Sequence, residues 1–399
     1  MSVAENVATS ATAVENGGEE VSGVEIQLEQ VSKRYPGQQH PAVENFSMVV
    51  PAGKIVIFVG PSGCGKTTTM RMINRLIEPT SGKITIGGKD ALSLNPDQLR
   101  RTIGYAIQQA GLFPHFTVGQ NIAVVPGLLG WTKQKISSRV DEMMDLVGLD
   151  PAQFRDRYPR QLSGGQQQRV GVARALAADP PVLLMDEPFG AVDPITRGNL
   201  QDELLRLQTD LKKTIVFVTH DFSEAVKLGD KIAVLGDRST ILQYDTPDAI
   251  LANPANDTVA GFVGAGASLK QLTLLRVRDI DYSDEGLITV TKGDSPADVR
   301  KRLTDARKTY GLVLDNRRRP LSWVHVRDLA AAGSLEAVAR PIGDSVSTQS
   351  TLQDALEAIL TEGGRAVVTG PRGEYVGGVD IETVMDTVRQ LRAEHGDDA

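Results

Sequence analysis

Short runs of β-branched and other apolar residues alternate with helical patterns from Val24 to about Phe262. The clearest runs predict strands at residues 54–60, 182–186, 214–219 and 231–235. Strands that alternate with helices are typical of an α/β domain with a largely parallel, buried sheet. We therefore expect one α/β domain over residues 25–262. Residues 1–24 lack any such periodicity, and we interpret them as a disordered tail.

A weak internal repeat covers the rest of the chain. Ser295 and Ser350 each open a helical pattern, with a proline directly after Ser295 and a capping-box form at residues 350–353. Two strand-like runs and another helix follow in each copy, at 311–314 and 321–326 and again at 366–368 and 375–379. The repeat predicts a paired α+β module over residues 263–393, divided into about 268–335 and 336–393. An acidic tail follows at residues 394–399.

Composition narrows the function classes. The chain of 399 residues has a net charge of −7 and a pI near 5.4, whereas general nucleic-acid binders are usually basic, so we expect no nucleic-acid partner. A single cysteine excludes a disulfide within the chain. No apolar run approaches the roughly 18 residues that span a bilayer. If a membrane is involved, we expect another subunit to cross it.

Residues 60–67 fit the pattern G-x-x-x-x-G-K-[ST] in full, between a strand pattern and a helical one. Glycines let backbone N–H groups cradle a phosphate chain, and the helix that follows directs its positive end at the same anion. Lys66 would add charge for the β- and γ-phosphates, and Thr67 a hydroxyl for Mg²⁺. Both flanks disfavour the alternative of a glycine-rich turn with a chance lysine. The predicted loop comprises Gly60, Pro61, Ser62, Gly63, Cys64, Gly65, Lys66, Thr67 and the adjoining Thr68.

The strand predicted at 182–186 ends in two carboxylates, Asp186 and Glu187. Ligands of open α/β sheets bind at the carboxyl ends of strands. Asp186 would therefore hold Mg²⁺ directly or through water. Glu187 points elsewhere and would orient or deprotonate an attacking water. Alone, such a pair is usually a solvated edge, and the phosphate loop upstream gives it its significance.

A second helix N-terminus lies between these two motifs, in the sequence Leu-Ser-Gly-Gly-Gln at residues 162–166. Ser163 would cap the helix and two glycines would allow close approach, which builds a second anion site. On this stretch alone an ordinary capped helix is an equal alternative. Together with the phosphate loop and the acidic strand, the stretch closely resembles the ABC ATPase family, whose signature is L-S-G-G-Q. The resemblance covers residues 25 to about 262 and implies a P-loop NTPase fold with a helical subdomain.

The resemblance implies roles for further residues. Tyr35 matches the aromatic residue that stacks on adenine, and Gln108 matches the glutamine that reaches Mg²⁺ and the attacking water, with Gln109 as an adjacent rival. Asp193 matches a loop that crosses the dimer interface, and His220 matches the histidine that contacts the γ-phosphate. A surface tyrosine and a structural histidine are the alternatives for Tyr35 and His220.

The resemblance also implies a homodimer packed head to tail, with ATP and Mg²⁺ between the copies. Each ATP would lie between the phosphate loop of one copy and five residues of the other, namely Ser163, Gly164, Gly165, Gln166 and Asp193. The implied catalytic residues are Lys66, Gln108, Glu187 and His220. The implied Mg²⁺ ligands are Thr67, Gln108 and Asp186.

The runs at 60–82, 107–115 and 189–197 resemble the branch of this family that imports quaternary amines such as glycine betaine, proline betaine, choline and carnitine. This implies transmembrane permease subunits, which residues 112–115 would meet, and a substrate-binding protein or domain. It also implies a place on the cytoplasmic face of the cell membrane. Another small solute remains an alternative cargo, and a soluble ABC ATPase acting on ribosomes or DNA is a further alternative.

The C-terminal repeat resembles tandem CBS domains in the order of its elements. That resemblance implies regulation by ionic strength or by an adenine-type nucleotide. Two basic runs, at 300–302 and 317–319, could serve an anionic lipid surface. A solvated helix face and a solvated turn are equally good interpretations of these runs.

Overall fold

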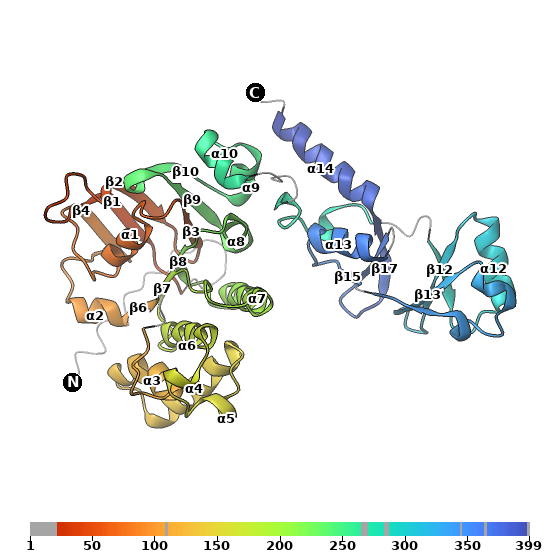
Figure 1. The fold of residues 1–399 in the computed structure, drawn as a ribbon, viewed down its shortest axis with the longest axis horizontal. Coiled ribbons are helices and arrows are strands. Elements are labelled where there is room, and N and C mark those ends of the chain that lie inside the picture. The colour runs from red at the N-terminus through yellow and green to blue at the C-terminus, as the bar shows by residue number, and fades with distance from the viewer. Residues whose placement is uncertain are drawn as a thin grey trace. The chain divides into compact units, whose positions relative to one another are not determined.

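The computed structural model describes residues 22–107, 111–264, 270–282, 287–343, 345–362 and 365–396. The chain forms two compact units (Figure 1), and the boundary between them lies between Phe262 and Val263, with Leu251–Asn253 grouped with the second unit. Of the predicted N-terminal tail, residues 1–21 lie outside the described residues. The predicted tail boundary at residue 24 is wrong for Gly23, whose N–H donates to the carbonyl of Lys212 at 2.9 Å.

The first unit contains two sheets and a set of helices. Its strands are β1 (Ile26–Lys33), β2 (Val43–Val50), β3 (Ile55–Val59), β4 (Ser81–Ile86), β5 (Lys89–Asp90), β6 (Ile103–Ala106), β7 (Val182–Asp186), β8 (Thr214–Val218), β9 (Lys231–Leu235) and β10 (Ile241–Asp245). Its helices are α1 (Lys66–Ile73), α2 (Pro96–Arg101), α3 (Val118–Leu128), α4 (Lys133–Leu146), α5 (Pro151–Phe154), α6 (Gly164–Leu176), α7 (Pro194–Leu211), α8 (Phe222–Leu228), α9 (Pro247–Ala252) and α10 (Asp257–Val263). Short 3₁₀ turns are η1 (Pro159–Gln161) and η2 (Asp237–Ser239).

The larger sheet has the strand order β10-β9-β3-β8-β7-β6. Its neighbours from β9 to β6 pair in parallel, and β10 adds an antiparallel edge. Every residue of β3, β7 and β8 is buried, which is why these strands read as continuous apolar runs. The predicted parallel sheet and its four predicted strands are confirmed.

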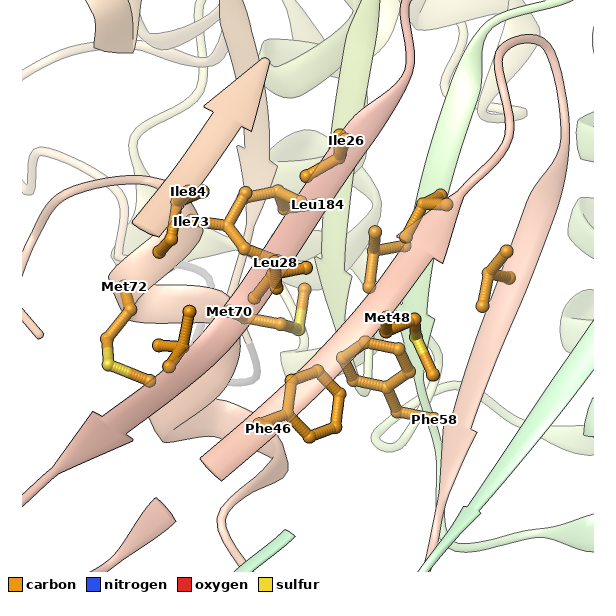
Figure 2. Packing of buried hydrophobic residues seen from close by; sticks show 14 of the residues in the cluster. Ile26, Leu28, Phe46, Met48, Phe58, Met70, Met72, Ile73, Ile84 and Leu184 are labelled. Atoms are coloured by element: carbon orange, nitrogen blue, oxygen red, sulfur yellow. The ribbon is translucent and has the colours of Figure 1, made fainter. Parts of the chain in front are cut away.

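The smaller sheet, β2-β1-β4-β5, is antiparallel. One apolar cluster joins this sheet to helix α1 and to the parallel sheet, as Figure 2 shows. Ile26 and Phe46 come from the smaller sheet, Met70 from α1, and Phe58 and Leu184 from the larger one; all are almost fully buried. Packing α1 between two sheets fixes the phosphate loop, because the loop is the direct link from β3 to α1.

The second unit consists of two copies of a small α+β fold. Its strands are β11 (Ile288–Thr291), β12 (Tyr310–Leu314), β13 (Pro320–His325), β14 (Arg340–Pro341), β15 (Val346–Ser347), β16 (Arg365–Thr369) and β17 (Tyr375–Asp380). Its α-helices are α12 (Pro296–Asp305), α13 (Leu352–Glu362) and α14 (Ile381–Gly396), and its 3₁₀ turns are η3 (Val277–Asp279), η4 (Asp328–Ala331) and η5 (Glu336–Val338). An apolar cluster of Leu312, Leu314, Val367 and Tyr375 joins the two copies.

Three details of the second unit differ from the sequence-based expectations. The helix expected after residue 326 is replaced by the 3₁₀ turns η4 and η5. The capping box of α13 is made by Thr351 and Asp354, each donating a backbone N–H to the other's side chain, and not by Ser350, which instead bonds to Ser347. Residues 272–280 belong with the core of the second copy, where Leu272 and Val277 are buried, so a division at residue 335 does not follow the packing.

Candidate functional site

The phosphate loop leaves β3 and curls over the start of α1. Gly63 and Gly65 have positive φ values of 82° and 110°, which glycine adopts at little cost. The Lys66 ammonium donates to the carbonyls of Gly60 and Pro61, each at 2.8 Å. The loop therefore closes around its own lysine in this structure, and Lys66 is held where a bound phosphate chain would take over those bonds.

The 3₁₀ turn η2 packs against the phosphate loop, a contact that the sequence analysis did not predict. Ser239 is 1% exposed and donates to the Cys64 carbonyl from its backbone N–H at 2.6 Å and from its hydroxyl at 3.0 Å. A Cβ atom on Gly65 would lie 2.3 Å from the Ser239 Oγ. The last glycine of the motif is thus required by the close approach of η2 as well as by its own φ.

The acidic strand end lies beside the loop, as predicted. The Thr67 hydroxyl donates to the Asp186 carboxylate at 3.1 Å. Burial raises the pKa of Asp186, the Thr67 hydrogen bond opposes that rise, and the neighbouring Glu187 carboxylate adds to it. Two hard oxygen ligands in a partly desolvated site fit a divalent cation such as Mg²⁺, which would offset the cost of the buried carboxylate charge.

We predict that Asp186→Asn stabilises the nucleotide-free protein. The raised pKa means that the carboxylate costs folding stability at neutral pH, and that this cost disappears as the pH falls below the ordinary Asp pKa. At pH 7 the thermal midpoint of the variant should lie above that of the wild type, and each 1 kcal/mol of stabilisation would raise the midpoint of a domain of roughly 150–250 residues by about 2–4 °C. Thermal unfolding from pH 7 to pH 4 checks this, with the difference shrinking at low pH. A lower midpoint for the variant at pH 7 would contradict it.

Glu187 occupies a strained position between the strand end and the loop that follows. Its φ is 47°, a conformation that non-glycine residues adopt mainly where surrounding contacts enforce it. Its carboxylate lies 3.4 Å from the His220 Nδ1, and His220 follows β8 directly after Thr219. The two predicted catalytic side chains are therefore brought together at the carboxyl edge of neighbouring strands.

Gln168 on α6 holds the backbone on either side of this turn, and the sequence analysis missed it. Its amide donates to the Glu187 carbonyl at 2.8 Å and accepts from the Ala191 N–H at 2.8 Å. The side chain is 4% exposed. The only available signal was its place in the helix that begins at the signature, since its partners are distant in sequence.

The signature residues form the N-terminus of α6, as predicted. Ser163 and Gln166 make a capping box, with the Gln166 N–H donating to the Ser163 hydroxyl at 3.2 Å and the Ser163 N–H to the Gln166 side chain at 2.9 Å. Gly165 passes close to the 190–193 loop, because a Cβ there would lie 3.1 Å from the Ala191 carbonyl. Asp193 caps α7 by accepting from the Thr196 N–H at 3.0 Å. Within one chain these residues serve as helix caps.

Two other predicted residues are less well defined. Tyr35 is partly buried two residues after the end of β1, and the Lys33 ammonium lies 5.3 Å from its ring centroid. Gln108 and its rival Gln109 lie outside the described residues. Beyond Gly111, the rings of Phe113, His115 and Phe116 form an aromatic group, in which Phe113 and His115 are exposed and Phe116 is partly buried.

The buried side chain of Asn121 supports that aromatic group. It accepts from the Phe113 N–H at 2.8 Å and donates to the Phe113 and Phe116 carbonyls at 3.2 and 3.1 Å. Phe113 remains 42% exposed, so the segment is rigidly mounted with an apolar residue facing outward. Over the part of the chain that the structure describes, no helix has the length and apolar character needed to cross a bilayer.

A phosphate loop after a parallel strand, with a carboxylate pair ending a nearby strand, defines the class of P-loop nucleotide hydrolases. Comparison with known proteins defines the family. The ABC transporter family matches residues 43–190. The osmoprotectant import ATP-binding protein OsmV of Salmonella typhimurium (strain LT2) is 42% identical over 367 residues, covering 90% of this chain and 95% of that protein.

A further relative and a solved structure support the same family. The glycine betaine/carnitine/choline transport ATP-binding protein OpuCA of Bacillus subtilis (strain 168) is 44% identical over 372 residues, covering 91% of this chain and 96% of that protein. The dimeric structure of MJ0796, a bacterial ABC transporter cassette, superposes with a TM-score of 0.53 at 33% identity, covering 55% of this chain and 98% of that one. This chain belongs to the ABC transporter family as an ATP-binding subunit, an ATPase coupled to transport.

Proposed function

We propose that two copies of this chain pair head to tail and energise an importer of quaternary amines such as glycine betaine, choline and carnitine. The cargo assignment rests on the length of the matches with relatives. Proteins named for osmoprotectant and glycine betaine/carnitine/choline transport match at least 90% of this chain, including the second unit. The dimeric state of the MJ0796 cassette supports the pairing. Transmembrane permease subunits and a substrate-binding protein would complete the importer at the cytoplasmic face of the membrane.

At the site, the loop would bind the phosphates of ATP through backbone N–H groups and Lys66. Mg²⁺ held by Thr67 and Asp186 would supply charge neutralisation for the phosphates. Glu187 would orient and deprotonate the attacking water. His220, whose Nδ1 lies 3.4 Å from the Glu187 carboxylate, would sense the γ-phosphate. The signature of the second copy, with Ser163 at its helix N-terminus, would close over the same ATP.

A direct test of the cargo is to reconstitute the chain with its permease and binding protein in vesicles and to measure ATP hydrolysis. We expect glycine betaine, choline or carnitine to stimulate hydrolysis, and amino acids without a quaternary ammonium group to leave it unchanged. Stimulation by an unrelated solute alone would contradict the assignment of quaternary amines as the cargo. It would show that the ATPase serves another importer.

We further propose that the second unit regulates the motor as a tandem CBS module. Its two α+β copies, joined through Leu312, Leu314, Val367 and Tyr375, support this resemblance. One arginine of each basic run forms an ion pair within the second unit: Arg302 with Asp294 at 3.3 Å, and Arg319 with Asp315 at 2.9 Å. The exposed Arg300 and Lys301 on α12 remain available to an anion.

Deleting residues 268–399 tests the regulation. The wild-type importer should change its ATPase rate with salt, with anionic lipid content or with an added adenine nucleotide, and the truncated importer should lose that response. The three additions, made separately, distinguish ionic strength, lipid and nucleotide as the signal. An unchanged response after the deletion, with the first unit still folded, would rule out the second unit as the sensor.

A further inference from the structure

Helix α6 contacts three parts of the first unit that take part in the proposed cycle. Its N-terminus presents Ser163 of the signature, and its middle holds the backbone of Glu187 and Ala191 through Gln168. Near its C-terminal end, Arg174 donates from Nη1 to the Gly111 carbonyl at 2.8 Å. One helix thus carries the signature at its N-terminus, holds the turn at residues 187–191, and contacts Gly111 at the beginning of the segment with the aromatic group.

The hydrogen bond from Arg174 is accepted at a turn in the backbone of that segment. Gly111 has a φ of 54°, so the chain turns sharply there before it reaches Phe113. From that residue on, Asn121 fixes the segment to α3 by three hydrogen bonds to Phe113 and Phe116. The segment therefore has one anchor on α3, through Asn121, and another on α6, through Arg174.

The charge of Arg174 favours this hydrogen bond. Partial burial lowers the pKa of its guanidinium, which nevertheless stays charged because an arginine pKa lies far above neutrality. A hydrogen bond from a charged donor is stronger than one between neutral groups. The bond therefore links the C-terminal part of α6 to the segment that begins at Gly111.

We propose that Arg174 is a positioning residue that transmits movement of the signature helix to the exposed segment 111–116, and so couples the ATP site to the permease. The inference rests on the proposed transport function. When the signature closes on a nucleotide, α6 shifts, and Arg174 carries Gly111 and the aromatic group with it. Without Arg174, the segment would keep its α3 anchor and no longer follow the nucleotide state.

Arg139 provides a matched control. This α4 arginine donates to the carbonyls of Leu176 and Ala177, each at 3.1 Å, at the same end of α6. Arg139→Met removes a comparable guanidinium-to-backbone interaction and leaves Gly111 untouched. Arg174→Lys keeps a positive charge and one donor, and should restore part of the coupling.

The first measurement uses the reconstituted importer. Arg174→Met should lower cargo-stimulated ATP hydrolysis, relative to the basal rate, by about fivefold or more, the lower range of typical coupling effects. Arg139→Met should retain the wild-type ratio, and the thermal midpoints of the two variants should agree. Equal ratios for the two variants would overturn the proposal.

The second measurement needs neither permease nor cargo, so it separates this inference from the proposed function. Hydrogen exchange at residues 111–117 is followed in the full chain carrying Glu187→Gln, with and without ATP. We expect ATP to change exchange there in that background and with Arg139→Met, and to leave it unchanged with Arg174→Met. An ATP-dependent change that survives Arg174→Met would refute the proposal even if the cargo assignment holds.

Discussion

Glu187→Gln should reduce ATP turnover by a factor of about 10²–10⁴, the usual contribution of a positioned general base. The amide cannot accept a proton from water, yet it has the size of the carboxylate and would keep the strained turn at φ 47° intact. ATP binding and pairing should therefore persist. Because hydrolysis no longer releases the nucleotide, the variant should accumulate in the ATP-bound, paired state.

Steady-state hydrolysis and nucleotide binding, measured on the same preparation, check this expectation. Glu203→Gln is a suitable control, because Glu203 is a glutamate of α7 whose ion pair with Arg206 lies on the surface. That control should hydrolyse ATP at the wild-type rate. Normal turnover in Glu187→Gln, or loss of ATP binding, would remove Glu187 from the role of base.

Lys66→Met should weaken ATP binding by roughly 10- to 100-fold, as the loss of one charge-assisted contact to a phosphate implies. Methionine retains the apolar stem, which is almost fully buried. It cannot donate to the Gly60 and Pro61 carbonyls, so a small loss of stability should accompany the loss of affinity.

Fluorescent-nucleotide titration measures the affinity. Lys54→Met is the control, since the Lys54 ammonium pairs with Asp230 at 3.1 Å on the surface near the start of β3, and ion pairs of this kind contribute little. The control should bind ATP as the wild type does. Equal affinities in the two variants would mean that Lys66 does not contact the phosphates.

Local patterns predicted much of this molecule. The strands β3, β7, β8 and β9 are continuous apolar runs, and the loop and its flanks form one contiguous motif, so each could be recognised from neighbouring residues alone. The same holds for the cap of α12, where Ser295 accepts from the Asp298 N–H at 3.3 Å. Asp186 and Glu187 followed from the carboxyl end of a predicted strand, whereas His220 was proposed only through the family resemblance.

The features that sequence could not predict depend on contacts between distant residues. Ser239 supports the phosphate loop from a turn in which Arg238 and Ser239 both have positive φ, and neither of these positions is a glycine that would signal it. The smaller antiparallel sheet pairs β1 with β4 across the whole of β3 and α1. Residues 272–280 join the second copy through backbone bonds such as Val277 N–H to the Ser350 carbonyl at 2.9 Å.

The central claim is that each ATP site is built from two copies of the chain, and a mixing experiment tests it most directly. Ser163→Arg keeps the phosphate loop and blocks the signature, while Lys66→Met disables the loop and keeps the signature. Each variant alone should be inactive. Random pairing in an equimolar mixture makes half of the dimers mixed. Each mixed dimer has one complete site of its two, so we expect roughly a quarter of wild-type ATPase activity to return. Activity that stays at the sum of the two separate variants would contradict a site shared between copies.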